Sequence, residues 1–251
     1  MKLVREHINE TVGVKPIKYI PPFEGDIKLS NKGLTELRKN LPKKITGSFY
    51  CNDNNLTSLV GSPKSVGKNF YCCNNNLTSL KGAPKWVGGN FYCNDNKLIS
   101  LEGAPEWVGE SFYCYNNNLT SLEGAPTLID GNFYCYNNNL TSLKGAPISV
   151  GGNFICGINN LTSLEGAPTS VGGDFFCDIN NLTSLEGAPT SVGGSFYCYG
   201  NKLISLEGAP TSVGRDFYCD KNYIPKEEIE RYFRTGAVQG TIYSDYGEYR
   251  R

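Results

Sequence analysis

The chain is built on a repeat of fixed length, and this feature limits its fold more than any other. Nine of its ten cysteines recur at a strict spacing of 21 residues, without insertion or deletion. They are Cys51, Cys72, Cys93, Cys114, Cys135, Cys156, Cys177, Cys198 and Cys219. Such a period is typical of solenoids, propellers and arrays, in which each unit buries its apolar face against the next. The middle of the chain is therefore expected to be a stack of like units.

One unit, read from residue 194, is G-S-F-Y-C-Y-G-N-K-L-I-S-L-E-G-A-P-T-S-V-G. In a short strand, alternation places Phe196 and Cys198 on one face and Tyr197 on the other. The remaining apolar positions of the unit are expected to join Phe and Cys inside, and they are Leu203, Leu206 and Val213. Stacking the units would then bury a continuous core.

The pattern F-x-C-x-x-N-x-L-x-x-L resembles the leucine-rich repeat, with Phe and Cys in its first two apolar positions. The match covers roughly residues 26–224. The near-identity of the units and the L-T-S-L-x-G-A-P continuation are also similar to tandem leucine-rich repeats of tailed bacteriophages and large DNA viruses. The resemblance implies a curved parallel β-sheet of about ten rungs and non-catalytic recognition of a protein through its concave face.

An asparagine follows each strand at the same position of the repeat. The amide of one such residue carries two donors and an acceptor, which can satisfy backbone groups that the bend leaves unpaired. The positions are Asn54, Asn75, Asn96, Asn117, Asn138, Asn159, Asn180, Asn201 and Asn222. We expect them to form a buried ladder.

The return side of each unit carries Gly-Ala-Pro, which excludes a helix there because proline lacks an N–H and restricts the residue before it. The convex side is therefore predicted to be extended. A glycine pair before most strands, such as Gly151 and Gly152, permits a tight turn into the strand. These glycines precede strands and not helices, which disfavours phosphate binding.

Three segments are predicted: an N-terminal cap with a degenerate repeat (1–46), nine 21-residue repeats (47–220) and a C-terminal cap (221–251). In the degenerate rung, Lys32 replaces the ladder asparagine, and the apolar positions are kept by Ile27, Leu29, Leu34, Leu37, Pro42 and Ile45. The C-terminal cap should hold a short amphipathic helix from Lys226 to Arg234, closed by Gly236, and a last strand within 241–246.

Composition limits the functional classes. Lys plus Arg (24) balances Asp plus Glu (24), which argues against nucleic-acid binding by the chain as a whole. The single histidine, His7, leaves few ways to build an acid/base relay, so we expect no enzyme, no catalytic residue and no cofactor. The first ten residues lack the apolar core of an export signal, and no apolar run is long enough to cross a bilayer. We therefore expect a cytoplasmic protein without a membrane partner, in the host cytoplasm if it is viral.

The repeated cysteines are predicted to be packing residues. Soft metal sites need several thiolates converging on one point, and one thiol per rung does not supply this, so no metal is expected. Cys73 differs because it falls on the outward face, where it would be accessible. We interpret the six Asn-Leu-Thr sequons as turn residues and not as glycosylation sites, because no export signal precedes them.

The outward face of the strands is the most informative surface. Its central column reads Tyr50, Tyr71, Tyr92, Tyr113, Tyr134, Ile155, Phe176, Tyr197 and Tyr218. Stacking between neighbouring strands explains part of this column. Recognition of a protein explains it equally well, because tyrosine is enriched at interface hot spots. Both interpretations stay open at this stage.

The flanking column varies from rung to rung, so the repeat does not dictate it. It places Tyr115 and Tyr136 beside Tyr113 and Tyr134, and this is the first candidate for a binding centre. A second candidate lies where Tyr197 and Tyr199 are flanked by acidic side chains, which suits a cationic partner segment. The predicted partner-binding residues are Tyr92, Tyr113, Tyr115, Tyr134, Tyr136, Tyr197, Tyr199, Asp178 and Asp220.

Two further columns lie elsewhere on the repeat. Lys43, Lys64 and Lys85 share one position on successive rungs, as either a solvated flank or a weak phosphate contact. Next to this column, Trp86, Trp107 and Leu128 share another position on successive rungs, as either a self-packed ridge or a secondary contact site. The function predicted is a protein-binding module for an unidentified partner, of the effector or adaptor type. The alternative is a self-assembling structural protein.

Overall fold

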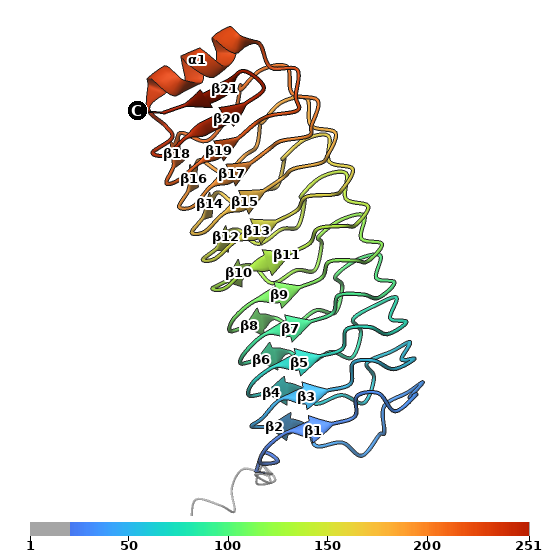
Figure 1. Cartoon of the computed structure of the whole chain (residues 1–251). Coiled ribbons are helices and arrows are strands. Elements are labelled where there is room, and N and C mark those ends of the chain that lie inside the picture. The colour runs from blue at the N-terminus through green and yellow to red at the C-terminus, as the bar shows by residue number, and fades with distance from the viewer. Residues whose placement is uncertain (1–20, 251) are drawn as a thin grey trace, which may run out of the picture.

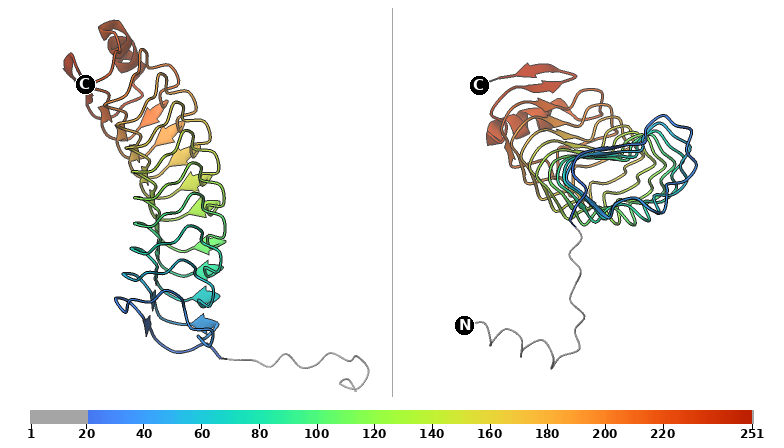
Figure 2. Two further views of the ribbon diagram at one scale, coloured as in Figure 1. Left: turned by 90° about the vertical axis from the view of Figure 1, so that its right-hand side faces the viewer. Right: turned by 90° about the horizontal axis from the view of Figure 1, so that it is seen from below.

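The computed structural model describes residues 21–250, and in this range the chain winds into one long coil that bends gently along its length (Figures 1 and 2). His7 and the start of the N-terminal cap lie outside the described residues. Each turn of the coil contributes one two-residue strand to a parallel sheet. Successive rungs pair in register, 21 residues apart from Phe49 on and 22 residues apart between the first rung and the second. The predicted fold is confirmed.

The main sheet has twelve strands. They are β1 (Ile27–Lys28), β3 (Phe49–Tyr50), β5 (Phe70–Tyr71), β7 (Phe91–Tyr92), β9 (Phe112–Tyr113), β11 (Phe133–Tyr134), β13 (Phe154–Ile155), β15 (Phe175–Phe176), β17 (Phe196–Tyr197), β19 (Phe217–Tyr218), β20 (Ile242–Ser244) and β21 (Gly247–Tyr249). The first ten are the rungs of the coil. β20 continues the parallel order and β21 turns back antiparallel to it.

The sequence pattern did not predict a second set of short strands (Figure 1). Each of them lies just before a main-sheet strand in the same rung and is joined to it by a short turn. Four of them pair as β2 (Lys44–Ile45), β4 (Ser65–Val66), β6 (Trp86–Val87) and β8 (Trp107–Val108). Five others pair as β10 (Leu128–Ile129), β12 (Ser149–Val150), β14 (Ser170–Val171), β16 (Ser191–Val192) and β18 (Ser212–Val213). In each strand the second residue is buried in the core.

The interruption between β8 and β10 has a local cause. In most rungs the residue after the buried valine is glycine, and a Cβ added there would meet the carbonyl oxygen of the preceding rung, at 2.3 Å for Gly109 and 2.1 Å for Gly172. At this position the rung of β10 carries Asp130. Its Cβ cannot make the same close approach, so the two rungs do not pair here. These glycines serve close packing and do not have positive φ.

The core is a set of columns in which each side chain stacks on its own equivalent. Nine phenylalanines, from Phe49 to Phe217, are fully buried, with neighbouring rings 5.1–5.5 Å apart. The nine repeat cysteines and the two leucines of each rung are also buried. Six of the thiols donate a weak hydrogen bond to a backbone carbonyl of the next rung, as Cys156 does to Phe176 with Sγ···O of 3.1 Å.

The asparagine ladder is confirmed. Asn138 Nδ2 donates to the carbonyl oxygens of Cys114 and Cys135, at 3.1 Å each, and its Oδ1 accepts from Leu119 N–H at 3.0 Å. The same contacts recur from rung to rung. Each amide therefore joins two rungs and satisfies backbone groups that would otherwise be buried without a partner.

Among the described residues the return side holds turns and no helix, as predicted. The glycine of Gly-Ala-Pro has positive φ, +98° at Gly82, in a turn closed by Ala83 N–H to Leu80 C=O at 2.9 Å. This is the conformation that the third residue of a type II turn requires, and glycine adopts it without strain.

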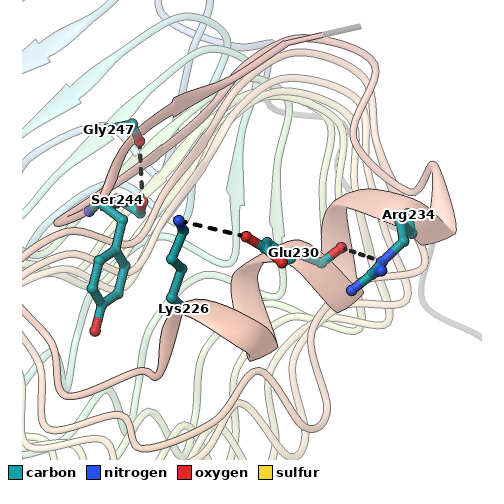
Figure 3. Close-up of polar contacts among 6 residues, drawn as sticks. Lys226, Glu230, Arg234, Ser244 and Gly247 are labelled. Carbon is teal, nitrogen blue, oxygen red and sulfur yellow. Dashed lines mark hydrogen bonds and ion pairs between the residues drawn. The ribbon is translucent and has the colours of Figure 1, made fainter.

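The C-terminal end is covered by α1 (Lys226–Thr235), with Gly236 as its left-handed C-cap. Ile229 and Tyr232 are buried against the last rung, and the Tyr232 hydroxyl donates to Pro210 C=O at 2.7 Å. Figure 3 shows the Lys226–Glu230 ion pair at 3.7 Å on the helix, and the bond from Ser244 to Gly247 C=O that closes the β20–β21 hairpin at 3.0 Å. The predicted helix and last strand are confirmed, and β21 is additional.

Replacing a glycine at the close approach should separate two rungs. We expect Gly172→Ala to lower the free energy of unfolding by about 1–3 kcal/mol, because its Cβ would lie 2.1 Å from the Gly151 carbonyl oxygen. Asp130→Ala is the matched control at the same repeat position, and should change stability by less than about 0.5 kcal/mol. Urea titration measures both. Equal effects of the two changes would contradict this account of the interruption.

The asparagine ladder is tested within a single turn. Asn138→Ala should cost about 3 kcal/mol, because it leaves the buried N–H of Leu119 and several carbonyls without partners. Asn139→Ala, at the exposed neighbouring position, should leave the urea midpoint nearly unchanged. If Asn138→Ala were as stable as Asn139→Ala, the hydrogen bonds of the ladder would not contribute to stability as proposed.

Candidate functional site

The outward face of the main sheet carries the predicted partner-binding residues. Alternation along each strand buries Phe112 and Cys114 completely and leaves Tyr113 between them half-buried on the outside. Because the rungs are in register, equivalent residues form straight columns across the sheet. The predicted tyrosines of the central column, Tyr92, Tyr113, Tyr134 and Tyr197, all lie on this face.

The central column is made of two aromatic stacks. Rings from Tyr50 to Tyr134 lie nearly parallel with centroids 4.4–4.7 Å apart. Ile155 interrupts them, and a second stack runs from Phe176 through Tyr197 and Tyr218 to Tyr243 on β20. Offset-stacked rings stabilise adjacent strands, so part of this column serves the fold itself.

The flanking column has one aromatic pair of its own. Tyr115 and Tyr136 stack at 4.6 Å, and Asn94, on the rung before Tyr115, is buried with its Oδ1 unpaired. Tyr115 and Tyr136, together with Tyr113 and Tyr134, form a cluster of four phenol rings on two adjacent rungs. Two of the four are not required by the repeat, because Asn52 and Asn94 occupy the same position on other rungs.

The phenols of Tyr115, Tyr134 and Tyr136 stay protonated at neutral pH. Burial is the main cause that raises the pKa of Tyr115, to about 12, with the neighbouring Tyr136 hydroxyl and Asp95 adding to it. Burial also raises the pKa of Tyr134 and Tyr136 above the usual value. Each phenol can therefore both donate and accept a hydrogen bond at an interface.

At the second candidate, the acidic side chains are largely engaged within the protein. Asp178 is only 8% exposed, and burial raises its pKa even though the Tyr199 hydroxyl donates a hydrogen bond to it. Its Oδ1 occupies the space that Gly157 leaves open, 2.7 Å from where a Cβ on that glycine would lie. Tyr199 is half-buried beside it, and Asp220 is half-buried one rung beyond. Asp178 thus lies beneath the surface and not on it.

A second polar ladder, missed at the sequence level, explains the acidic residues that precede these strands. Asp174 Oδ1 accepts from Ser195 N–H at 2.7 Å, and Asp216 Oδ1 accepts from Thr241 N–H at 2.8 Å. Asn, Ser or Asp fills this position on every rung from Ser48 on, and each side chain accepts from the next rung. The restriction to three short polar residue types is the signal that could have revealed it.

Two isoleucines beside this region adopt an unusual backbone conformation. Ile158 and Ile179 have φ of +52° and +51°, where other rungs carry Asn, Asp, Lys or Gly, and both are 48% exposed. Left-handed φ is strained for a β-branched residue. Both are exposed apolar side chains at positions where other rungs place polar residues or glycine.

The secondary contact surface lies on the strands of the second set, away from the tyrosines. We call Trp86, Trp107 and Leu128 the tryptophan flank. Their exposed fractions are 52%, 42% and 60%, and the two indole rings touch with centroids 5.9 Å apart. The lysine column is aligned beside it, since Lys64 N–H donates to Lys43 C=O and Lys85 N–H to Lys64 C=O.

The thiols form no metal site among residues 21–250, where no group of three or more His, Cys, Asp or Glu residues is arranged to hold an ion. The nine repeat cysteines are buried and Cys73 is half-buried. Burial raises the pKa of Cys73 to about 11, so even this thiol is largely protonated at neutral pH. In the part of the chain that the structure covers, no helix has the length and apolarity to span a bilayer.

Comparison with known proteins supports the fold. No protein-family model matches the chain, and no curated protein sequence matches it. Among solved structures, YopM from Yersinia enterocolitica WA-314 is similar with a TM-score of 0.53 and 21% identity, over 79% of this chain and 47% of YopM. This chain has the leucine-rich-repeat fold. It spans about half the length of that YopM chain.

A second structure, of YopM from Yersinia pestis, is described as a leucine-rich effector protein. It matches with a TM-score of 0.41 and 18% identity, over 79% of this chain and 78% of that one. The likeness to the first structure, at 21% identity, concerns the fold alone.

The buried thiols predict a loss of stability at alkaline pH. Burial raises their pKa above the ordinary 9.0, to about 12 for Cys219, so the folded chain keeps protons that the unfolded chain releases. Stability is fully present below pH 9 and should fall from pH 9 toward 12, by about 1.4 kcal/mol per pH unit for each thiol. Urea midpoints between pH 7 and 10.5 measure this. Cys73→Ser should lose somewhat less stability than wild type over this range, because the raised pKa of Cys73, about 11, no longer contributes. A constant wild-type midpoint would contradict the prediction.

Proposed function

We propose that the chain is a non-catalytic recognition module that binds a partner protein through the tyrosine-bearing face of its main sheet. The observation that carries the proposal is the Tyr115–Tyr136 pair, which departs from the repeat and stacks beside Tyr113 and Tyr134. Such a cluster combines rigid apolar area with hydroxyl groups at low entropic cost, as interface hot spots do.

The composition of the face supports a protein partner over nucleic acid or a small molecule. Tyrosine and asparagine dominate the columns. The edge of the face carries the carboxylates of Asp53 and Asp95 on the rungs before Tyr115, and Lys221 takes the same position only on the last rung. These carboxylates would repel phosphate. Tyr197, Tyr199 and Asp220 extend the same face toward the C-terminal end, and we include them in the proposed surface.

An effector or adaptor role in the cytoplasm follows from the resemblance of the repeats to phage and viral leucine-rich repeats, and we propose it on that basis. The alternative is self-assembly, in which the same face docks on a second copy. It is distinguished by the mass of the purified protein in light scattering across a range of concentrations.

The double substitution Tyr115→Asn/Tyr136→Asn tests the proposed face. Asparagine occupies this position at Asn52 and Asn94, so the fold accepts it, and only the stacking term of about 0.5–1.5 kcal/mol should be lost. Affinity capture from a cell lysate, with retained proteins identified and then purified, should show a partner that wild type holds and the variant binds at least tenfold more weakly.

The matched control is Ile99→Thr/Ile204→Thr, which replaces two exposed side chains outside both candidate surfaces by the threonine of other rungs and should retain that partner. If both variants held every protein that wild type holds, the tyrosine pair would have only a structural role. A drop of more than about 3 kcal/mol in the stability of Tyr115→Asn/Tyr136→Asn would point the same way.

A further inference from the structure

A separate surface on the second set of strands departs from the repeat as sharply as the tyrosine pair does. At the position of the tryptophan flank, other rungs carry serine: Ser65, Ser149, Ser170, Ser191 and Ser212. Serine therefore satisfies the fold at this position. The serine rungs fold without the Trp86–Trp107 ring contact, so the fold does not require three consecutive large apolar residues here, each at least 42% exposed.

The flank has a charged continuation. Lys44 pairs in register with Ser65, and Ser65 with Trp86, so this lysine lies in the same column as the tryptophans. Lys43 and Lys64 lie beside it, one on each of the two rungs before Trp86. All three are exposed, and none has an ion-pair partner among residues 21–250.

Lys85, the next lysine of the column, is ion-paired, and it lies at the boundary between the basic part and the apolar part of this surface. Lys85 Nζ is bound to Glu106 Oε1 at 2.6 Å, across the rungs of Trp86 and Trp107. The free positive charge therefore stops where the apolar surface starts. Beyond Leu128, Ile148 adds one more apolar side chain that is 59% exposed. The surface is polarised along the coil, basic over two rungs and apolar over the following rungs.

We propose that the tryptophan flank and Lys43, Lys44 and Lys64 form a second docking surface, which binds an acidic amphipathic segment of a partner protein. Carboxylates at one end of the segment would meet the three lysines, and apolar side chains at the other end would cover Trp86, Trp107 and Leu128. Four rung steps separate Lys44 from Leu128, about 19 Å at the usual strand spacing. A helix of about 13 residues has this length.

Charge favours a protein segment over a lipid surface. Glu106, Glu110 and Asp130 are exposed on the same rungs as Trp107 and Leu128. An anionic bilayer would be repelled by these carboxylates wherever it covered the indole rings. A folded segment can place its own carboxylates only over the lysines and leave the acidic rungs to apolar or basic side chains.

The flank also coincides with the interruption of the second set of strands. The backbone ladder stops between β8, which carries Trp107, and β10, which carries Leu128. Trp107 and Leu128, one on each side of this interruption, are both exposed. A bound segment would cover the interruption together with the flank, and strand pairing is continuous along the serine rungs from β12 to β18.

A random 15-residue peptide library, displayed on phage, is selected on the full chain and counter-selected on Trp86→Ser/Trp107→Ser/Leu128→Ser. We expect enriched peptides with net negative charge and at least two large apolar residues. Their affinity, measured by fluorescence anisotropy, should fall at least tenfold with the triple serine variant, and as much with Lys43→Glu/Lys44→Glu/Lys64→Glu. Affinity should be unaffected by Tyr115→Asn/Tyr136→Asn, which separates this surface from the tyrosine face.

Circular dichroism of the triple serine variant should match wild type, since five rungs already carry serine. Enrichment of basic peptides, or of none that depend on the flank, would overturn the proposal. So would flank-dependent binding to vesicles of phosphatidylglycerol without peptide binding, which would assign the surface to a bilayer. Concentration-dependent dimers abolished by the triple serine change would assign it to a second copy.

Discussion

In-register stacking at a fixed 21-residue step is the constraint on which the rest of this structure depends. Each side chain lies beside its own equivalents, so a residue type is allowed at a position only if it packs well on itself. Phenylalanine does so with rings 5.1–5.5 Å apart, and cysteine does so with a weak bond to the next carbonyl. Asparagine does so by bonding to backbone groups of two rungs at once. The sequence keeps a strict period because each residue must pack against the equivalent residues of the two neighbouring rungs.

The core could be predicted from the sequence because apolar identity and period are enough to place Phe, Cys and Leu inside. The asparagine ladder could be predicted for a similar reason, since an invariant amide at a bend has few other uses. The second set of strands could not, because Ser65-Val66 and its equivalents show only one alternation, too short to indicate a strand. The β8–β10 interruption depends on the distance between one Cβ and one carbonyl oxygen, which no pattern reveals.

The acidic residues near Tyr199 show where reasoning from residue type fails. Asp174, Asp178 and Asp216 share a charge and a neighbourhood, and this suggested one acidic patch. Two of them accept backbone N–H bonds from the next rung, and Asp178 fills the space above Gly157. Each has a different internal partner, and such partners lie 21 to 25 residues away or in the gap left by a missing side chain. Only coordinates can separate a carboxylate that the fold uses from one that faces a ligand.

Departures from the repeat are therefore more informative about function than the repeat itself. A uniform column, such as the central tyrosines, is explained first by stacking, because its members stabilise one another whatever else they do. Tyr115 and Tyr136 replace asparagine, and the tryptophan flank replaces serine, without entering any ladder of the core. The two departures meet on the same rungs, since β8 and β10 run directly into β9 and β11. The rungs are otherwise nearly identical. The residues that distinguish them therefore lie on both sides of one turn, at surface positions where a substitution does not disturb the stacking of the core.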